Sequence, residues 1–318
     1  MSDMVVFTIA DYPIRISAFV IGLGLLLCGV LFIKSYYRVT GRITEALAEF
    51  SFGFVLSCFL GRLLHWYFNA EMYGSSFAVA FTNFDIGSFV LPAAIVGVWA
   101  ASYLVHWLHP SSSRLTVLDA LAPPLALLFA FVRISALFSI NKICRGKMTI
   151  ADGIPFPTFL VSAVLMFCVF LLLKRMEKKQ ENAEEGDVWY WFVLLYAVVS
   201  VVMDSTRSDS PLMHFQVLSS LNQFSAFVSL GQVMPAIFVL VITIKWSIRS
   251  IRVNGLQWYT ILAWLLFATS LFGIGFLGEY KIQRTAQYLL RYPIMCAFCC
   301  LLLFSEYLLR YCGKETRA

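Results

Sequence analysis

The sequence contains few charged residues. Lysine, arginine, aspartate and glutamate make up 13% of its 318 residues, against about a quarter in soluble proteins. The mean hydropathy is +0.80, and 60% of the residues are hydrophobic. No polar stretch exceeds about 20 residues, the length of one membrane span, so there is no room for a sizeable soluble domain. This composition excludes a soluble globular protein and predicts an all-α, polytopic membrane protein.

Features that mark other protein classes are also missing. Only one of the eight cysteines, Cys144, falls in a connecting loop, which excludes a disulfide framework. The first apolar run has no basic n-region or small-residue cleavage site, so we expect it to be retained as a span. We find no metal-ligand spacing, glycine-rich phosphate loop or nucleophile elbow, and the net charge of +6 is modest. We therefore expect no metal, no organic cofactor and no nucleic-acid partner.

Apolar runs recur along the whole chain, and each is long enough to cross the roughly 30 Å hydrocarbon core of a bilayer. They predict nine transmembrane helices, at approximately residues 17–33, 46–69, 88–108, 115–140, 155–174, 188–204, 225–246, 257–277 and 290–310. Tryptophan and tyrosine cluster near the ends of these runs, as interfacial anchors do.

Lysine and arginine are distributed unevenly between the two sides of the predicted bundle. Fourteen of the 24 fall on one side and eight on the other, while Arg62 and Arg133 fall inside spans. Positive charge accumulates in cytoplasmic loops. We therefore predict that the N-terminus lies outside and the C-terminus lies in the cytoplasm.

Arg133 lies within the apolar run 120–140, where a charge costs roughly 2.5–3.5 kcal/mol on insertion scales. Arg62 and His65 repeat this pattern in the run 50–68 and share one helix face. We expect both arginines to point into one cavity between spans two, four and six, open to the outer leaflet. Two membrane arginines favour a shared anionic ligand, and the nearest anion in a bilayer is a lipid phosphate. Whether His65 is a packing residue or a base stays open.

A basic loop follows the span that carries Arg133. Lys142, Arg145 and Lys147 lie on the side expected to be poor in positive charge, and Arg207 follows another span on that side. One interpretation is a tolerated statistical exception, or a loop that only meets lipid head groups. The other is a basic mouth above Arg133 that binds an anionic lipid head group.

Acidic residues near the span ends have competing interpretations. Asp204 lies about two helical turns after Tyr196, near the same face, and three residues before Arg207. It either pairs with Arg207 or orients a cationic or hydroxyl group in the outward cavity. Asp119, at the start of the fourth span, is predicted to cap that helix. Glu49, near the cytoplasmic end of the second span, is interpreted as a polar tether.

Several stretches, in order along the chain, resemble the prolipoprotein diacylglyceryl transferase family of bacterial inner membranes. Gly61-Arg62 resembles the family's second-span GR element, and residues 84–89 resemble the loop before its third span. Residues 119–141 resemble the family signature, which begins with D-x-I-A-P and ends in G-R-x-G-N-F-x-N-x-E. Residues 196–207 resemble its Y-x3-R-x3-E-x2-R element, and residues 229–232 resemble the S-x-G-Q that opens its last span. The resemblance covers about residues 15–245. It implies a seven-helix domain over residues 1–246 and a two-helix extension with a short tail over residues 247–318.

By this resemblance, the chain would move a diacylglyceryl group from phosphatidylglycerol to a lipobox cysteine thiol and release glycerol phosphate. Its partners would be an anionic phospholipid and a prolipoprotein signal peptide, in the bacterial cytoplasmic membrane. Arg133 would hold the lipid phosphate, Tyr196 would line the cavity and Arg62 would support the bundle near the site. The predicted catalytic residues are His65, Arg133 and Asp204, and the predicted lipid-binding residues are Arg62, Arg133, Asn141, Lys142, Arg145, Tyr196 and Arg207.

The chain departs from the family pattern at positions that carry chemistry. The family's third-span histidine falls near Leu91-Pro92, its signature asparagines are Ala136 and Ser139, its signature glutamate is Asn141, and the first arginine of its later element is Ser200. Two functions follow. The chain is either a divergent transferase, with His65 as the candidate base, or a catalytically lapsed relative that binds lipid or lipopeptide as an accessory or transport partner.

Overall fold

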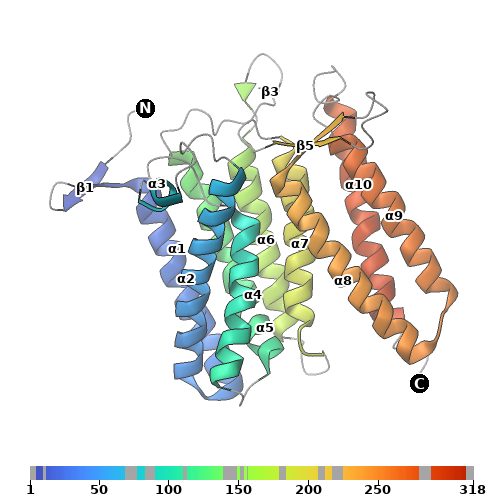
Figure 1. Cartoon of the computed structure of the whole chain (residues 1–318), viewed down its shortest axis with the longest axis horizontal. Helices are drawn as coiled ribbons and strands as arrows, with labels where there is room; N and C mark the ends of the chain where they lie inside the picture. The colour runs from blue at the N-terminus through green and yellow to red at the C-terminus, as the bar shows by residue number, and fades with distance from the viewer. Residues whose placement is uncertain are drawn as a thin grey trace. The chain divides into compact units, whose positions relative to one another are not determined.

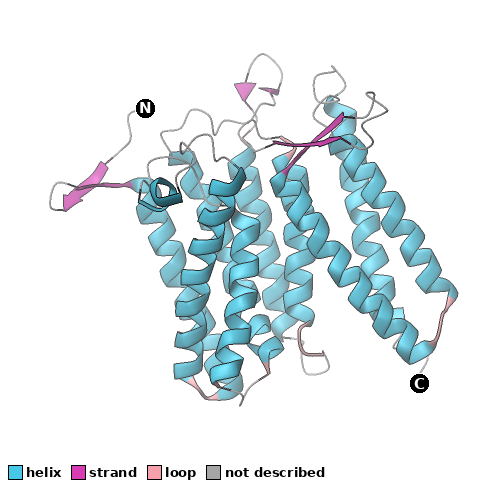
Figure 2. Ribbon diagram, in the orientation of Figure 1, coloured by secondary structure: helices cyan, strands magenta, loops and turns pink. Residues whose placement is uncertain are grey.

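The computed structural model describes residues 5–9, 12–68, 77–82, 90–109, 113–138, 149–150, 154–155, 157–178, 184–206, 212–216, 225–278 and 288–312. Within this part of the chain all long elements are helices, and the strands form short antiparallel hairpins (Figure 2). Nine of the described helices are long and apolar enough to cross a membrane. The predicted all-α fold and its nine spans are therefore confirmed, while the orientation of the termini stays a prediction.

The helices follow one another along the chain (Figure 1). They are α1 (Ile16–Thr40), α2 (Ile43–Phe68), α3 (Phe77–Thr82), α4 (Leu91–Leu108), α5 (Arg114–Ser135, continued by the 3-10 turn η2, Ala136–Phe138), α6 (Thr158–Lys178), α7 (Asp187–Asp204), α8 (Leu230–Asn254), α9 (Trp258–Gly278) and α10 (Tyr288–Tyr307, continued by the π-helical η7, Leu308–Cys312). The hairpins pair β1 (Val5–Ile9) with β2 (Tyr12–Arg15), β3 (Thr149–Ile150) with β4 (Ile154–Pro155), and β5 (Leu212–Gln216) with β6 (Ser225–Ser229).

The chain forms two compact units. The first comprises Met1–Tyr196 with Arg207–Pro211, and the second comprises Ala197–Thr206 with Leu212–Ala318. In the first unit α5 is the central helix and packs on α1 and α6, while α2 packs along α4. Apolar residues occur all round α5, and most of them are buried, as expected of a helix packed among other helices.

The buried face of α2 is polar, which reverses the pattern of a helix in a soluble protein. Its buried residues are Glu45, Ala46, Glu49, Gly53, Gly61, Arg62 and His65. These positions recur every three to four residues and therefore form one stripe along the helix. Large apolar residues on the other positions, including Phe52, Val55 and Phe59, are exposed and suit contact with lipid. The predicted inward orientation of Arg62 and His65 is thereby confirmed.

A glycine sets the distance between α2 and α4. A β-carbon on Gly97 would lie 2.5 Å from the backbone nitrogen and 2.6 Å from the Cα of Ser57. The backbones of the two helices therefore touch at this point, and only glycine fits. The Ser57 hydroxyl reinforces the contact by donating a hydrogen bond to the carbonyl oxygen of Ala94 at 2.9 Å.

A carboxylate joins α1 to α6 at the end of the unit where α1 terminates. Glu177 accepts hydrogen bonds from the Ser35 hydroxyl at 2.9 Å, the Arg38 guanidinium at 2.8 Å and the Lys174 ammonium at 2.6 Å. The Glu177 side chain is 8% exposed and the Arg38 side chain 64% exposed. Because Glu177 is shielded and bridges two helices, this network fixes helix position better than an exposed ion pair would.

Asp119 caps a helix, but not the one in which it lies. The prediction that it opens its own helix is wrong, because α5 begins at Arg114 with Ser113 at the N-cap position. The Asp119 carboxylate instead accepts hydrogen bonds from the backbone N–H groups of Gly186, at 2.6 Å, and Trp189, at 2.8 Å. These groups belong to the first turn of α7, which lacks intrahelical acceptors for its N–H groups. A residue of α5 thus supplies the hydrogen-bond acceptors that the start of α7 lacks.

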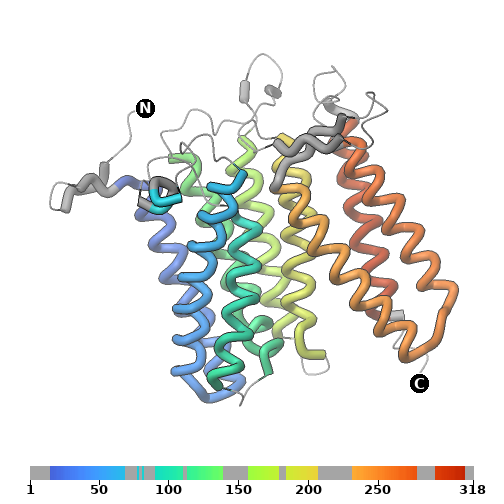
Figure 3. Tube along the Cα trace, viewed as in Figure 1, coloured from blue at the N-terminus to red at the C-terminus, as the bar shows by residue number. Residues whose placement is uncertain are grey.

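The second unit contains α8, α9 and α10, and α9 packs along α10 (Figure 3). The α8–α9 turn passes through Gly255, whose positive φ of 71° suits a residue without a side chain. The interior of this unit contains buried polar groups. Thr243, in the middle of α8, lies against Glu306, near the end of α10, and both side chains are fully buried.

The close α2–α4 contact predicts opposite effects for two glycine substitutions. Gly97→Ala should lower the free energy of unfolding by about 1–3 kcal/mol, because the added methyl overlaps the α2 backbone. Gly22→Ala, in α1, meets no atom within 4 Å and should raise it by about 0.5–1 kcal/mol through helix propensity. Thermal denaturation of both purified variants measures the effect. Equal midpoints for the two would contradict the contact.

The Asp119 cap predicts a second, graded loss of stability. Asp119→Ala leaves two buried N–H groups of α7 without their acceptor, which should cost on the order of 1–3 kcal/mol. Asp119→Asn keeps one carbonyl acceptor and should lose less. Glu185→Gln alters an exposed residue of the same turn and serves as the control. The thermal midpoint should be highest for the control, lower for Asp119→Asn and lowest for Asp119→Ala. An Asp119→Ala protein with the wild-type midpoint would refute the cap.

Candidate functional site

Arg62 and His65 lie one turn apart in the last two turns of α2. Their exposed fractions are 2% and 7%, so both side chains are enclosed by the first unit rather than presented to lipid. The backbone N–H of Val90 donates a hydrogen bond to the carbonyl oxygen of Gly61 at 3.2 Å. This bond holds the start of α4 beside the turn that carries Arg62. The Gly61-Arg62 element is therefore a point where α2 and α4 are joined.

Arg133 occupies the last turn of α5 and is 8% exposed. It lies at the same end of the first unit as Arg62, because α2 and α5 both run toward the end where α4 begins. Helix α1 packs tightly here: a β-carbon on Gly24 would lie 2.6 Å from the Cβ of Phe131. The structure thus holds two guanidinium groups and one imidazole inside one end of the unit. Guanidinium groups in such a place suit a phosphate, which they bind through two parallel hydrogen bonds.

Tyr196 is brought next to the helix of Arg133. Its ring centroid lies 5.2 Å from that of Phe129, which precedes Arg133 by one turn of α5. Phe192 completes the cluster, 6.0 Å from Phe129 and 6.3 Å from Tyr196. Tyr196 itself is 2% exposed. Aromatic packing between α5 and α7 therefore positions a phenol close to the turn that carries the arginine.

Asp204 belongs to the second unit and has a different neighbour. It is 6% exposed, at the end of α7, and its carboxylate lies so close to Gly231 that a β-carbon there would overlap it. Only glycine at position 231, in the segment 229–232, leaves room for the Asp204 carboxylate. Sequence reasoning identified both residues but did not connect them, because nothing in their spacing signals a contact between α7 and α8.

The other predicted site residues lie outside the part of the chain that the structure describes. These are Asn141, Lys142, Arg145 and Arg207, together with Lys147 of the basic loop. The roles given to them stay predictions, as does a pairing of Asp204 with Arg207. Among the residues that are described, no group of three or more His, Cys, Asp or Glu side chains could hold a metal ion.

A search of curated proteins finds no match to the chain. The sequence model of the family described as prolipoprotein diacylglyceryl transferase matches residues 4–248. The match spans α1 to most of α8, and it contains Arg62, His65, Arg133, Tyr196 and Asp204. The nine apolar helices found among the described residues agree with a family of membrane transferases that act in lipoprotein biosynthesis. The chain belongs to the prolipoprotein diacylglyceryl transferase family.

Proposed function

We propose that the protein moves a diacylglyceryl group from an anionic glycerophospholipid of the phosphatidylglycerol class to the cysteine thiol of a prolipoprotein lipobox. The setting is the bacterial cytoplasmic membrane. The observation that carries the proposal is the burial of Arg62 and Arg133 at one end of a membrane domain of this family. Two guanidinium groups enclosed at one end of the unit suit the phosphate of the donor lipid, which guanidinium groups bind through parallel hydrogen bonds.

Arg133 binds the phosphate and stabilises it as it departs. In the transfer, the thiolate sulfur bonds to the glyceryl carbon next to the phosphate ester, and the carbon–oxygen bond to that phosphate breaks. Glycerol phosphate leaves with the bonding electron pair. Negative charge therefore grows on the phosphate oxygens, where a fixed guanidinium lowers the barrier most. Arg62 adds a second positive charge on the same side of the unit.

His65 activates the thiol. The thiolate is the nucleophile, and a free cysteine titrates near roughly 8.5, so a base increases the reactive fraction at neutral pH. The family's third-span histidine is replaced at Leu91-Pro92, and His65 lies one turn from Arg62 on the buried face of α2. Its imidazole accepts the proton of the incoming thiol as the carbon–sulfur bond forms.

The remaining residues shape the lipid site. Tyr196 lines it next to Phe129. Asn141, Lys142, Arg145 and Arg207 contact the head group from the outward side, where their charges favour an anionic lipid. This arrangement uses the predicted orientation of the chain.

A second function is favoured by the replaced family positions. Ala136, Ser139 and Ser200 stand where the family has two asparagines and an arginine. These changes remove donors that would stabilise the departing phosphate while leaving Arg133 in place. The alternative is therefore a relative without transferase activity that binds lipid or lipopeptide and serves as an accessory or transport partner.

Complementation separates the two functions. The wild-type gene should restore lipoprotein mobility and growth to a strain depleted of its own diacylglyceryl transferase. Arg133→Gln should abolish the rescue and lower transfer in vitro by roughly 10²–10³-fold, because a charged donor to the departing phosphate is lost. The same variant should also retain less phosphatidylglycerol after purification. A wild type that retains the lipid but modifies no lipobox peptide would support the non-catalytic alternative.

Replacing the proposed base gives a different signature. His65→Gln should reduce transfer by roughly 10²–10⁴-fold, the usual contribution of a general base. Lipid retention should stay near the wild-type level, because the imidazole is assigned no contact with the phosphate. His106→Gln is the control, because His106 lies in the last turn of α4, whereas the start of α4 lies beside the turn that carries Arg62. Transfer at the wild-type rate in the His65 variant would remove this residue from the mechanism.

A further inference from the structure

A pocket of about 290 Å³ lies within the second unit, and we call it the α8–α10 pocket. It is lined by the last turns of α7, the first turns of α8, the end of α9 and the middle of α10. Gln232 and Cys299 contribute polar side-chain atoms, and none of the described residues that line the pocket is charged. Its lining is therefore suited to an apolar ligand and offers no ion pair to a charged one.

The pocket follows from the way in which three helices of the unit meet. Helix α8 is joined to α9 by the turn at Gly255, and η7, which continues α10, packs on both α8 and α9. These contacts hold the three helices together at the end where α8 terminates. Toward its start, α8 runs away from α9 and α10 at an angle (Figure 1). Val239 of α8, Ile274 of α9 and Leu302 of α10 form a buried wall of the resulting wedge.

The mouth of the pocket lies at the depth of lipid chains. Ile237 of α8 and Leu271 of α9 also line the pocket, and their exposed fractions are 52% and 38%. Each lies six residues inside its apolar span, Gly231–Asn254 or Trp258–Leu277, which is about 9 Å along the helix. The hydrocarbon core of a bilayer is roughly 30 Å thick. The medium at the mouth is therefore hydrocarbon.

The volume of the pocket distinguishes between apolar occupants. A helix with its side chains is about 10–12 Å across and rises about 5.4 Å per turn, so one turn alone takes up roughly 400–600 Å³. The pocket, at about 290 Å³, is too small for a partner's helix. A methylene group takes up about as much space as a water molecule in the liquid, about 30 Å³. The pocket therefore has room for about ten methylene groups of a single alkyl chain.

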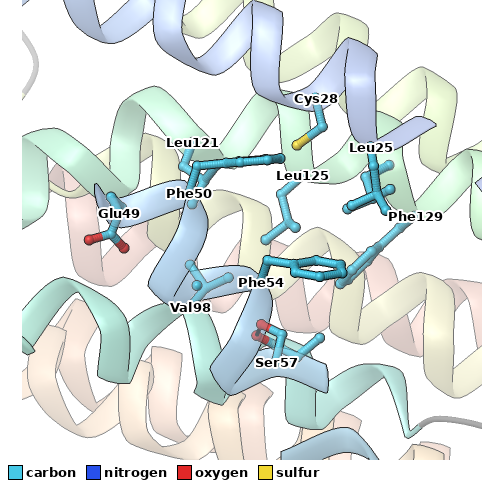
Figure 4. A pocket seen from close by; sticks show the side chains of 13 residues that line it. Leu25, Cys28, Glu49, Phe50, Phe54, Ser57, Val98, Leu121, Leu125 and Phe129 are labelled. Carbon is cyan, nitrogen blue, oxygen red and sulfur yellow. Dashed lines mark hydrogen bonds between the residues drawn. The ribbon is translucent and has the colours of Figure 1, made fainter. Parts of the chain in front are cut away.

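A second apolar pocket, in the first unit, shows why size matters. It lies between α1, α2, α4 and α5, and Phe50, Phe54 and Phe129 are among its lining residues (Figure 4). Its volume is about 70 Å³, which is room for about two methylene groups. Protein interiors normally leave only small voids of this kind, because side chains pack closely. The α8–α10 pocket is about four times larger and is open to the membrane.

We propose that the α8–α10 pocket binds one fatty acyl chain of a membrane glycerophospholipid. The chain enters from the bilayer between Ile237 and Leu271 and lies against the wall formed by Val239, Ile274 and Leu302. It fills the wedge and thereby holds α8 against α9 and α10. The proposal goes beyond diacylglyceryl transfer, because α9 and α10 lie outside the family match over residues 4–248.

Photocrosslinking of the full chain in lipid nanodiscs tests the site. The probes are phosphatidylcholine and phosphatidylglycerol that each carry a diazirine near the end of one acyl chain. After illumination, peptide mass spectrometry should find adducts on the wall residues, foremost Cys299 and Leu302 of α10. Both lipids should label this wall to the same extent, because the described lining has no charge to select a head group. The proposed transfer site, in contrast, selects the anionic lipid.

Filling the pocket should remove the label. Gly275 lines the pocket, and a β-carbon there meets no atom within 4 Å, so Gly275→Leu places a side chain in open space at the rim. Ala236→Leu narrows the pocket from α8. Each variant should lower the α10 adducts several-fold. Gly22→Leu, in α1, is the matched control, because a β-carbon there also meets no atom and Gly22 does not line the α8–α10 pocket.

Three results would overturn the proposal. Adducts confined to exposed residues such as Leu265 and Phe272, with none on the wall, would show only the lipid that surrounds any membrane protein. Wall adducts from phosphatidylglycerol alone would show that the pocket belongs to a site for anionic lipid. Undiminished wall adducts in both filled variants would place the chain elsewhere. The wild-type adduct map decides the first two points even if a filled variant fails to fold, and loss of transferase activity changes none of them.

Discussion

A bilayer interior offers no hydrogen-bond partner to a polar group, and this constraint organises the whole chain. Helix α2 shows it most directly. Its stripe from Glu45 through Glu49 to Arg62 and His65 faces the inside of the first unit, and its large apolar residues face outward. The same constraint explains why α2 places its polar stripe against α4 and away from lipid. In a soluble protein the buried face of a surface helix is apolar, whereas here the buried face of α2 carries charged residues.

Satisfying buried polar groups requires contacts between helices that are far apart in the sequence. Asp119 of α5 supplies acceptors to the first turn of α7, and Glu177 of α6 accepts from Ser35 and Arg38 of α1. Close approach is the other requirement. Gly97 lets the backbones of α2 and α4 touch, so that the stripe on α2 is covered along its length. These contacts hold the frame within which Arg62 and Arg133 are buried.

Family membership and the replaced family positions bear on function in different ways. The match over residues 4–248 establishes the fold lineage and the setting in lipoprotein biosynthesis. The chemistry depends on individual side chains, and several of those differ from the family pattern. Arg133 nevertheless stays buried in the last turn of α5, one turn beyond the Phe129–Tyr196 contact. An anion-binding role is common to both proposed functions, and the presence or absence of a base distinguishes them.

The sequence by itself determined the class, the nine spans and the inward orientation of Arg62 and His65. Hydropathy and the cost of membrane charges are local properties, readable from composition and helical spacing. It also identified Asp204 and the SLGQ glycine as candidate positions. Only the tertiary structure decided that Asp119 caps α7 instead of α5, that Asp204 packs on Gly231, and that Glu49 is buried with no hydrogen-bond partner among the described residues. The reason is physical: a side chain's hydrogen-bond partner, and the space around it, depend on which helices become neighbours, and helix packing is set by contacts across the whole bundle.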